Sequence, residues 1–215
     1  MVASYRGKQV LRIKNAHKVN GDMNVEKKQI SIPQMRGSFQ SYHLNVMCNF
    51  LNKIIVHEIN VLEIGAFSGE STYIFSHYFN SVHSVDSWKN GNDTTNEAGM
   101  QNVDMNFVFD AYRNRVNVMK NVSFNRCTSN HFFKNVYKPE IHSFNMVYID
   151  GSHEVEQVKK DIDNSIKILG DDGIICGHDY HWNEGLNKLV RYKFDAKPLF
   201  VFQDGSWCVI PEKYL

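Results

Sequence analysis

The chain has 215 residues, 42% of them hydrophobic, which is enough to fill the core of one domain of ordinary size. Its formal net charge of +1 shows no overall bias toward nucleic acid or an anionic membrane. Cys48, Cys127, Cys176 and Cys208 form no CxxC pair, which favours reduced thiols. No apolar run approaches the roughly 20 residues needed to cross a bilayer. We therefore expect a cytoplasmic protein without a nucleic-acid or membrane partner.

The N-terminal part of the chain has little hydrophobic periodicity. Residues 1–40 contain turn signals such as Asn20-Gly21-Asp22 and Arg36-Gly37, so we expect an arm or lid there. Residues 41–215 are expected to form a single domain, since no repeat or linker divides them. Helical spacing of apolar residues predicts a helix over Tyr42–His57, which leads into the first strong strand signal.

The stretch Val61–Ser71 joins a short apolar run to a helical pattern through a loop with two glycines. Gly65 and Gly69 leave this loop without side-chain bulk, so a ligand could approach the N–H groups at the start of the helix. Glu63 is the odd residue of the apolar run. Its carboxylate needs hydrogen-bond donors, which either a ligand or a neighbouring helix start would supply.

Strand and helix patterns then alternate along the chain, as in a doubly wound α/β fold. After a helix over Ser71–Phe79, we expect strands over 82–86, 122–125, 144–150 and 174–179 and helices after 103, over 155–169 and over 185–193. Two further strands flank Asp204-Gly205, a turn that suits a closing hairpin. Residues 89–102 are polar and predict an excursion over the sheet edge. In the helix over 155–169, Lys159, Lys160, Asp161 and Asp163 are expected to form a solvated face.

Four acidic residues follow predicted strands: Glu63, Asp86, Asp150 and Asp179. The carboxyl ends of parallel strands share one rim, where ligands bind, and an acidic residue after the second strand commonly accepts hydrogen bonds from a ribose diol. Carboxylates at close range need a cation, bound donors or raised pKa values. Asp150 and Asp179 could therefore ligate magnesium or another hard cation, or accept backbone N–H groups at loop and helix starts.

Four motifs, taken in order, resemble those of class I S-adenosylmethionine-dependent methyltransferases: Val61–Gly69, Val85–Trp88, Tyr148–His153 and Gly177–Tyr180. They are most similar to the small O-methyltransferases that include macrocin-type sugar methyltransferases, with catechol-type enzymes more distant. The resemblance covers residues from about 60 to 182. It implies a Rossmann-like fold with a mostly parallel seven-stranded sheet, helices on both faces and an antiparallel last strand.

The resemblance also implies a site for S-adenosylmethionine along the rim. The glycine loop would approach the methionine part, Asp86 would bind the ribose hydroxyls, Ser87 and Trp88 would lie beside the adenosine, and Thr128 and Ser129 near the adenine. The residues assigned to the cofactor in this way are Glu63, Gly65, Ala66, Ser68, Gly69, Asp86, Ser87, Trp88, Thr128, Ser129 and Asp150.

Asp150 and Asp179 occupy positions that bind a metal in catechol-type enzymes, so the resemblance implies magnesium as a second cofactor. Tyr180, however, stands where those enzymes have an amide ligand, which removes a third protein ligand. His153 falls where they carry a catalytic lysine. It is therefore the expected general base, with Asp150 as the second catalytic residue; the alternative is a residue at a helix N-terminus that only orients Asp150.

We expect an enzyme that methylates an oxygen of a small hydroxylated acceptor, such as a sugar or a secondary metabolite. One alternative is a non-catalytic cofactor-binding protein of the same fold. Another is a dinucleotide-dependent oxidoreductase, which is disfavoured because residues 65–69 give Gly-x-x-x-Gly in place of G-x-G-x-x-G. The neutral charge argues against methylation of nucleic-acid bases. Domains of this kind often pair through a helix or an N-terminal arm, so a homodimer is one expectation.

Overall fold

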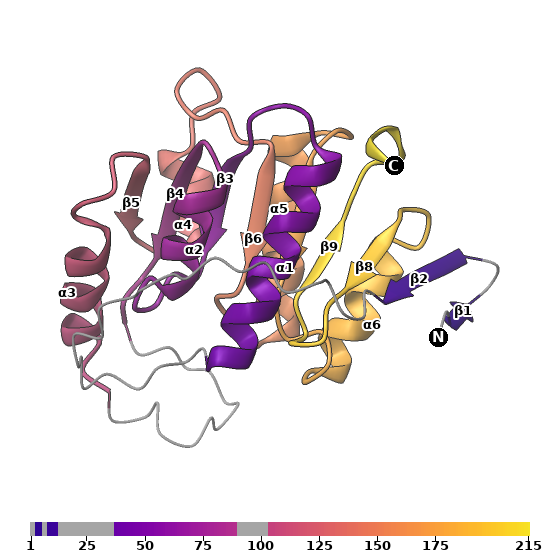
Figure 1. Ribbon diagram of the computed structural model, residues 1–215. Helices are drawn as coiled ribbons and strands as arrows, with labels where there is room; N and C mark the ends of the chain where they lie inside the picture. The colour runs from indigo at the N-terminus through magenta and orange to yellow at the C-terminus, as the bar shows by residue number, and fades with distance from the viewer. Residues whose placement is uncertain (1–2, 6–7, 13–36, 90–102) are drawn as a thin grey trace.

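The computed structural model describes residues 3–5, 8–12, 37–89 and 103–215 (Figure 1). The predicted excursion after residue 89 and residues 13–36 of the predicted arm lie outside these ranges. In the described part of the chain, no helix is long and apolar enough to cross a membrane.

A single mixed sheet runs through the protein in the order β1-β2-β8-β9-β7-β6-β3-β4-β5. Its strands are β1 (Ala3–Tyr5), β2 (Lys8–Arg12), β3 (Asn60–Ile64), β4 (Ser81–Asp86), β5 (Val122–Arg126), β6 (Met146–Ile149), β7 (Ile174–Gly177), β8 (Leu199–Val201) and β9 (Trp207–Val209). From β5 to β7 all pairs are parallel, and β9 runs antiparallel to both of its neighbours, β7 and β8. The predicted mostly parallel seven-stranded sheet with an antiparallel last strand is confirmed for β3 to β9.

Two further strands come from the segment predicted as an arm or lid. β1 and β2 pair antiparallel, and β2 adds to the sheet parallel to β8. A sheet edge carries unpaired N–H and C=O groups, and a short strand laid along it satisfies them. Part of residues 1–40 therefore extends the sheet.

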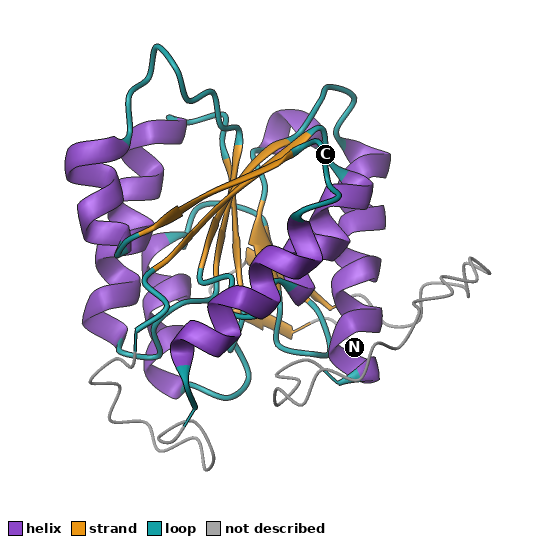
Figure 2. Ribbon diagram, turned by 90° about the vertical axis from the view of Figure 1, so that its left-hand side faces the viewer, coloured by secondary structure: helices purple, strands orange, loops and turns teal. Residues whose placement is uncertain are grey.

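Helices cover both faces of this sheet, as Figure 2 shows. They are α1 (Ser38–Ile54), α2 (Glu70–Tyr78), α3 (Met105–Val116), α4 (Ser129–His131), α5 (Val155–Leu169) and α6 (Glu184–Lys193), with a π-helix η2 (Phe132–Val136) and a 3-10 helix η3 (Glu212–Tyr214). The helix predicted over Tyr42–His57 begins at Ser38, because the Gln40 side chain accepts a hydrogen bond from the Gly37 N–H (3.2 Å). The sequence analysis predicted no helix over residues 129–136, where α4 runs into η2.

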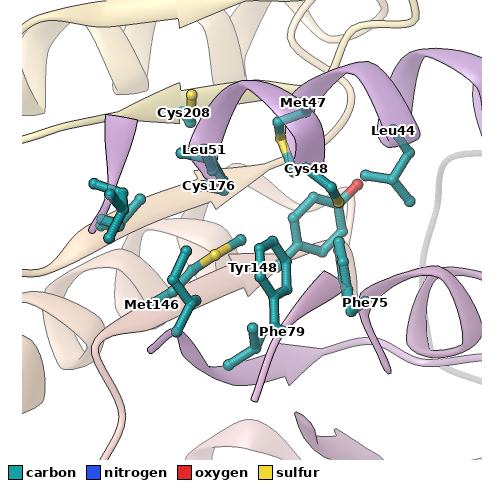
Figure 3. Packing of buried hydrophobic residues seen from close by; sticks show 14 of the residues in the cluster. Leu44, Met47, Cys48, Leu51, Phe75, Phe79, Met146, Tyr148, Cys176 and Cys208 are labelled. Atoms are coloured by element: carbon teal, nitrogen blue, oxygen red, sulfur yellow. The ribbon is translucent and has the colours of Figure 1, made fainter. Parts of the chain in front are cut away.

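One hydrophobic core lies between the sheet and the helices α1 and α2 (Figure 3). Fully buried members include Leu44, Met47, Cys48, Leu51, Phe75, Met146, Tyr148, Cys176 and Cys208. Cys176 on β7 and Cys208 on β9 are direct cross-strand partners, and both are free thiols. Packing within this core fixes α1 against the strands whose carboxyl ends form the rim of the sheet.

The second core lies on the opposite face, under α5 and α6. Val158 and Ile162 of α5 pack there on alternate residues of β3, β6 and β7. The prediction that Asp161 belongs to a solvated face is wrong, since its exposed fraction is 1%. Asp161 lies one turn after Val158, so it falls on the buried side of α5, where its carboxylate accepts a hydrogen bond from Gln157 (3.1 Å).

Candidate active site

The glycine loop between β3 and α2 lies directly against the end of β6. Gly65 has φ of +88°, and a Cβ atom there would lie 2.2 Å from the backbone oxygen of Asp150. Gly69 has φ of +81° and immediately precedes α2. The predicted role of these glycines was close approach of a ligand. The structure shows a second reason for Gly65, since the loop must pass within contact distance of the β6 backbone.

Asp86, at the end of β4, holds this loop in place. Its Oδ2 accepts hydrogen bonds from the N–H groups of Ala66 (3.0 Å) and Phe67 (2.9 Å), and its Oδ1 accepts one from Trp88 (2.7 Å). Burial raises the pKa of Asp86, while the three N–H groups and Arg126 oppose this shift. Among described residues, these donors occupy three of the roughly four acceptor positions of a carboxylate.

Trp88 supports the loop from the core side. Its exposed fraction is 1%, and its ring packs at a centroid distance of 4.7 Å from each of Phe109 and Tyr112. The indole Nε1 donates a hydrogen bond to the carbonyl of Phe67 (2.7 Å). The ring is thus part of the scaffold that fixes the loop, and the neighbouring Ser87 is half-buried; a place for both beside an adenosine stays a prediction.

Glu63 is completely buried beneath the start of α2. Its two carboxylate oxygens accept hydrogen bonds from the hydroxyls of Ser71 (2.5 Å), Thr72 (2.5 Å) and Ser84 (2.7 Å). The start of α2, one of the two sources of donors expected from the sequence, therefore supplies hydrogen bonds to Glu63, together with Ser84 of β4. Glu63 ties β3 to α2 and β4, directly behind the glycine loop. Ala66 and Ser68 within that loop are also buried.

Thr128 and Ser129 follow β5 at the same rim. The Thr128 hydroxyl accepts a hydrogen bond from the His131 N–H (3.2 Å) and so caps α4. Ser129 accepts a hydrogen bond from the Gln157 amide (3.2 Å), which also donates to Asp161. Burial raises the pKa of Asp161 to about 6, against the hydrogen bonds from Ser129 and Gln157. These contacts fasten the segment after β5 to α5.

Beyond the glycine loop, the ends of β6 and β7 bring two acidic and two imidazole side chains together. Asp179 lies between the imidazoles, with its Oδ2 3.1 Å from Nε2 of His153 and its Oδ1 2.9 Å from Nδ1 of His178. The same Nδ1 is 3.8 Å from Oδ1 of Asp150. Burial opposes ionisation of Asp179, but the hydrogen bonds and charges of the two histidines outweigh it and lower the pKa. Three residues that the sequence singled out, Asp150, His153 and Asp179, thus meet in one place.

Asp204 approaches the cluster from the β8–β9 turn. Its exposed fraction is 1%, and its Oδ2 lies 3.9 Å from Nε2 of His178. Hydrogen bonds from the Ser206 N–H (3.0 Å) and hydroxyl (2.7 Å) fix the carboxylate. The sequence showed Asp204 only as half of a hairpin turn. Because hairpins with Asp-Gly turns are common, no local signal marks this one as part of a site.

Tyr180, the departure from the expected metal-ligand pattern, does not take part in the cluster. The ring is buried in the core under α6, and its hydroxyl accepts a hydrogen bond from Nε of Arg191 (2.7 Å). A third group suited to a metal comes from the residue on the other side of Asp179. Donor atoms of Asp150, His178 and Asp179 all lie within 4.8 Å of one another.

Comparisons with known proteins agree with this fold. The family described as Methyltransferase domain matches residues 62–180, while no curated protein matches the chain. Similar solved structures include the O-methyltransferase TomG from Streptomyces achromogenes (12% identity, covering 84% of this chain and 83% of that chain, TM-score 0.57). Others are the O-methyltransferase NovP (15%, 82% and 81%, 0.58) and the TDP-rhamnose 3′-O-methyltransferase CalS11 (13%, 81% and 80%, 0.54). Identities this low show the fold alone, but the family match spans more than half of the residues, and this chain belongs to the methyltransferase-domain family.

Proposed function

We propose that this methyltransferase transfers the methyl group of S-adenosylmethionine to an oxygen atom of a small hydroxylated acceptor. The observation that supports this most strongly is the contact between the glycine loop and the acid–imidazole cluster, made where Gly65 meets the backbone of Asp150. The loop is the expected binding site of the cofactor. The cluster of Asp150, His153, His178 and Asp179 carries the groups that would bind an acceptor hydroxyl and remove its proton. Binding and proton removal would then occur side by side.

S-adenosylmethionine supplies an already activated methyl group. The protein must therefore hold the acceptor oxygen in line with that group and remove its proton. Asp86 supports the first task by fixing the loop, through its hydrogen bonds to Ala66 and Phe67. Glu63 adds a buried anchor for the helix that follows.

His153 is the proposed general base. Its Nε2 faces Asp179 at 3.1 Å, an arrangement in which a carboxylate fixes the tautomer and orientation of an imidazole. In the neutral ring held this way, Nδ1 carries the lone pair that can accept a proton. His153 precedes the N-cap of α5, which is Glu154, and its backbone carbonyl accepts a hydrogen bond from Asn183 (2.9 Å). The ring and the backbone are therefore held from two directions, which favours the base over a simple helix-end role.

Asp150 and Asp179 are the proposed metal ligands, and magnesium is the cation that the family resemblance suggests. The two carboxylates and the neighbouring imidazole form a compact donor set that fits a divalent cation. When bound, such a cation would supply positive charge that lowers the pKa of an acceptor hydroxyl. We further propose a cytosolic location, which the four free cysteines support, and a homodimer.

The test is a reaction screen with S-adenosylmethionine and a panel of sugars, nucleotide sugars and catechols, in which formation of S-adenosylhomocysteine and the site of methylation are read by mass spectrometry. We expect O-methylated product, with His153→Asn slowing turnover about 10²-fold to 10⁴-fold. His181→Asn is the matched control, because His181 is an exposed imidazole that contacts the carbonyl of Phe202. Methylation on nitrogen, or a wild-type rate in His153→Asn, would refute the proposal.

A further inference from the structure

We propose that the rim binds a divalent transition metal through a nitrogen ligand, His178, and that Asp204 is the residue that orients this ligand. The inference deepens the proposed function and rests on it, because the cation would serve the same acceptor hydroxyl. It replaces an all-oxygen magnesium site, which the sequence suggested, with a site of two carboxylates and one imidazole.

The first step is the spacing of the donor atoms, which is that of ligands around a single ion. Ligand atoms that each lie about 2.1 Å from one ion are about 3 to 4 Å from one another at tetrahedral or octahedral angles. Nδ1 of His178 lies 2.9 Å from Oδ1 of Asp179 and 3.8 Å from Oδ1 of Asp150. Those two separations match the ligand shell of a single ion, and donor atoms of all three residues lie within 4.8 Å of one another.

Rigidity of the ligands is the second step. His178 and Asp179 follow β7 directly, and the His178 N–H donates a hydrogen bond to the carbonyl of Ile149 on β6 (3.1 Å). Asp150 follows β6, and its N–H donates to the carbonyl of Ile64 on β3 (2.8 Å). Three neighbouring strands therefore fix the donors, as a preorganised metal site requires.

Orientation of the imidazole is the third step. Nδ1 of His178 lies close to the two carboxylates, and Nε2 of the same ring lies 3.9 Å from Oδ2 of the buried Asp204. An imidazole that binds a metal through one nitrogen typically has a carboxylate, a carbonyl or a water at the other. The bonds from Ser206 hold Asp204 in this position. A cation between Nδ1 and the two carboxylates would displace the proton from Nδ1, and the negative charge of Asp204 would then stabilise the tautomer with the proton on Nε2.

The donor set decides the class of metal. Magnesium is bound almost entirely by oxygen, whereas imidazole nitrogen suits zinc, copper, iron and nickel, and the affinity of a site with nitrogen and oxygen ligands rises from manganese through cobalt to copper. Two carboxylates with a neutral imidazole also balance the charge of a divalent ion. Tyr180, turned into the core toward Arg191, supplies no oxygen in place of the missing amide. Selection of a transition metal over magnesium follows.

The experiment uses the full chain, stripped with a chelator and titrated with Mn²⁺, Co²⁺ or Mg²⁺ alone. We expect Mn²⁺ and Co²⁺ to bind at least about 10-fold more tightly than Mg²⁺, with ¹⁴N modulation in the spin-echo spectrum of bound Mn²⁺. His178→Asn should remove the nitrogen signal and narrow the preference for Mn²⁺, because the amide offers oxygen. Asp204→Asn should weaken Co²⁺ binding about 10-fold to 100-fold and shift its visible absorption.

His181→Asn is the matched control and should keep wild-type affinity and the ¹⁴N signal. The proposal is overturned if no metal binds, if Mg²⁺ binds as tightly as Mn²⁺, or if the nitrogen signal is absent or survives in His178→Asn. Binding of S-adenosylhomocysteine is measured on the same samples. If it binds and the metal result is negative, only the metal inference fails; if it does not bind, the proposed function fails as well.

Discussion

Asp161 gives a prediction whose size can be worked out from the structure. This carboxyl is buried on α5, and its pKa rises from 3.8 to about 6 because burial disfavours the charged form. Between these two pKa values the folded protein binds more protons than the unfolded chain. The free energy of unfolding therefore falls as pH rises through this window, since ionised Asp161 is better solvated in the unfolded state.

The cost of ionisation follows from the two pKa values. It amounts to about 0.6 kcal/mol at pH 4, about 1.6 kcal/mol at pH 5 and about 3 kcal/mol at pH 7, where both states are fully ionised. Asp161→Asn removes this titration while an amide oxygen remains to accept the hydrogen bond from Gln157. Relative to wild type, the variant should gain about 2 kcal/mol of stability between pH 4 and pH 7.

Urea unfolding at several pH values between 4 and 8, followed by circular dichroism, measures this difference. Asp171→Asn, at an exposed turn, is the control and should track wild type across the range. A stability difference between Asp161→Asn and wild type that does not change with pH, or that shrinks as pH rises, would refute the reasoning.

Three other substitutions test how the glycine loop is supported. Glu63→Gln weakens three hydroxyl hydrogen bonds to a buried charge and should cost about 1.5 to 3 kcal/mol in urea unfolding, whereas Glu58→Gln on the surface should cost less than about 0.5 kcal/mol; equal losses would contradict this. Gly65→Ala puts a Cβ 2.2 Å from a backbone oxygen and should lower the free energy of unfolding by more than about 3 kcal/mol. Gly170→Ala, at a position with positive φ but open space, should lower it by about 1 to 3 kcal/mol, and an equal or larger loss there would contradict the close contact at Gly65. Trp88→Phe removes the indole donor to the loop, so it should lower the free energy of unfolding by about 1 to 2 kcal/mol and weaken binding of S-adenosylhomocysteine. Unchanged binding would show that this hydrogen bond does not position the loop for the cofactor.

Much of the fold could be predicted because its signals are local. The apolar run at β3, the helical spacing of α5 and the Asp-Gly turn before β9 each appear within a short stretch of chain. The strands β1 and β2 could not be predicted, since they are short and the edge strand β8, with which β2 pairs, lies far away in sequence. The burial of Asp161 could not be predicted either, because a charged residue on an amphipathic helix usually faces solvent.

The site was predictable where residues follow strand ends and not where partners come from elsewhere. Asp150 and Asp179 could be placed on one rim from their positions after β6 and β7. The donors to Glu63 are hydroxyls on α2 and β4, and nothing in the sequence distinguishes these residues from other serines and threonines. Asp204 reaches His178 only because the last hairpin folds back beside β7, a contact that depends on tertiary structure.

Binding of S-adenosylmethionine at the rim underlies every proposed role of the residues there. Isothermal titration of the full chain with S-adenosylhomocysteine, with NAD⁺ as comparison, tests this most directly. We predict micromolar binding of S-adenosylhomocysteine, none of NAD⁺, and at least about 100-fold weaker binding in Asp86→Ala, which loses the bonds that order the loop. Asp110→Ala, at an exposed position on α3, should bind as wild type does. Absence of S-adenosylhomocysteine binding in the folded wild type, or equal affinity in Asp86→Ala, would contradict the central claim.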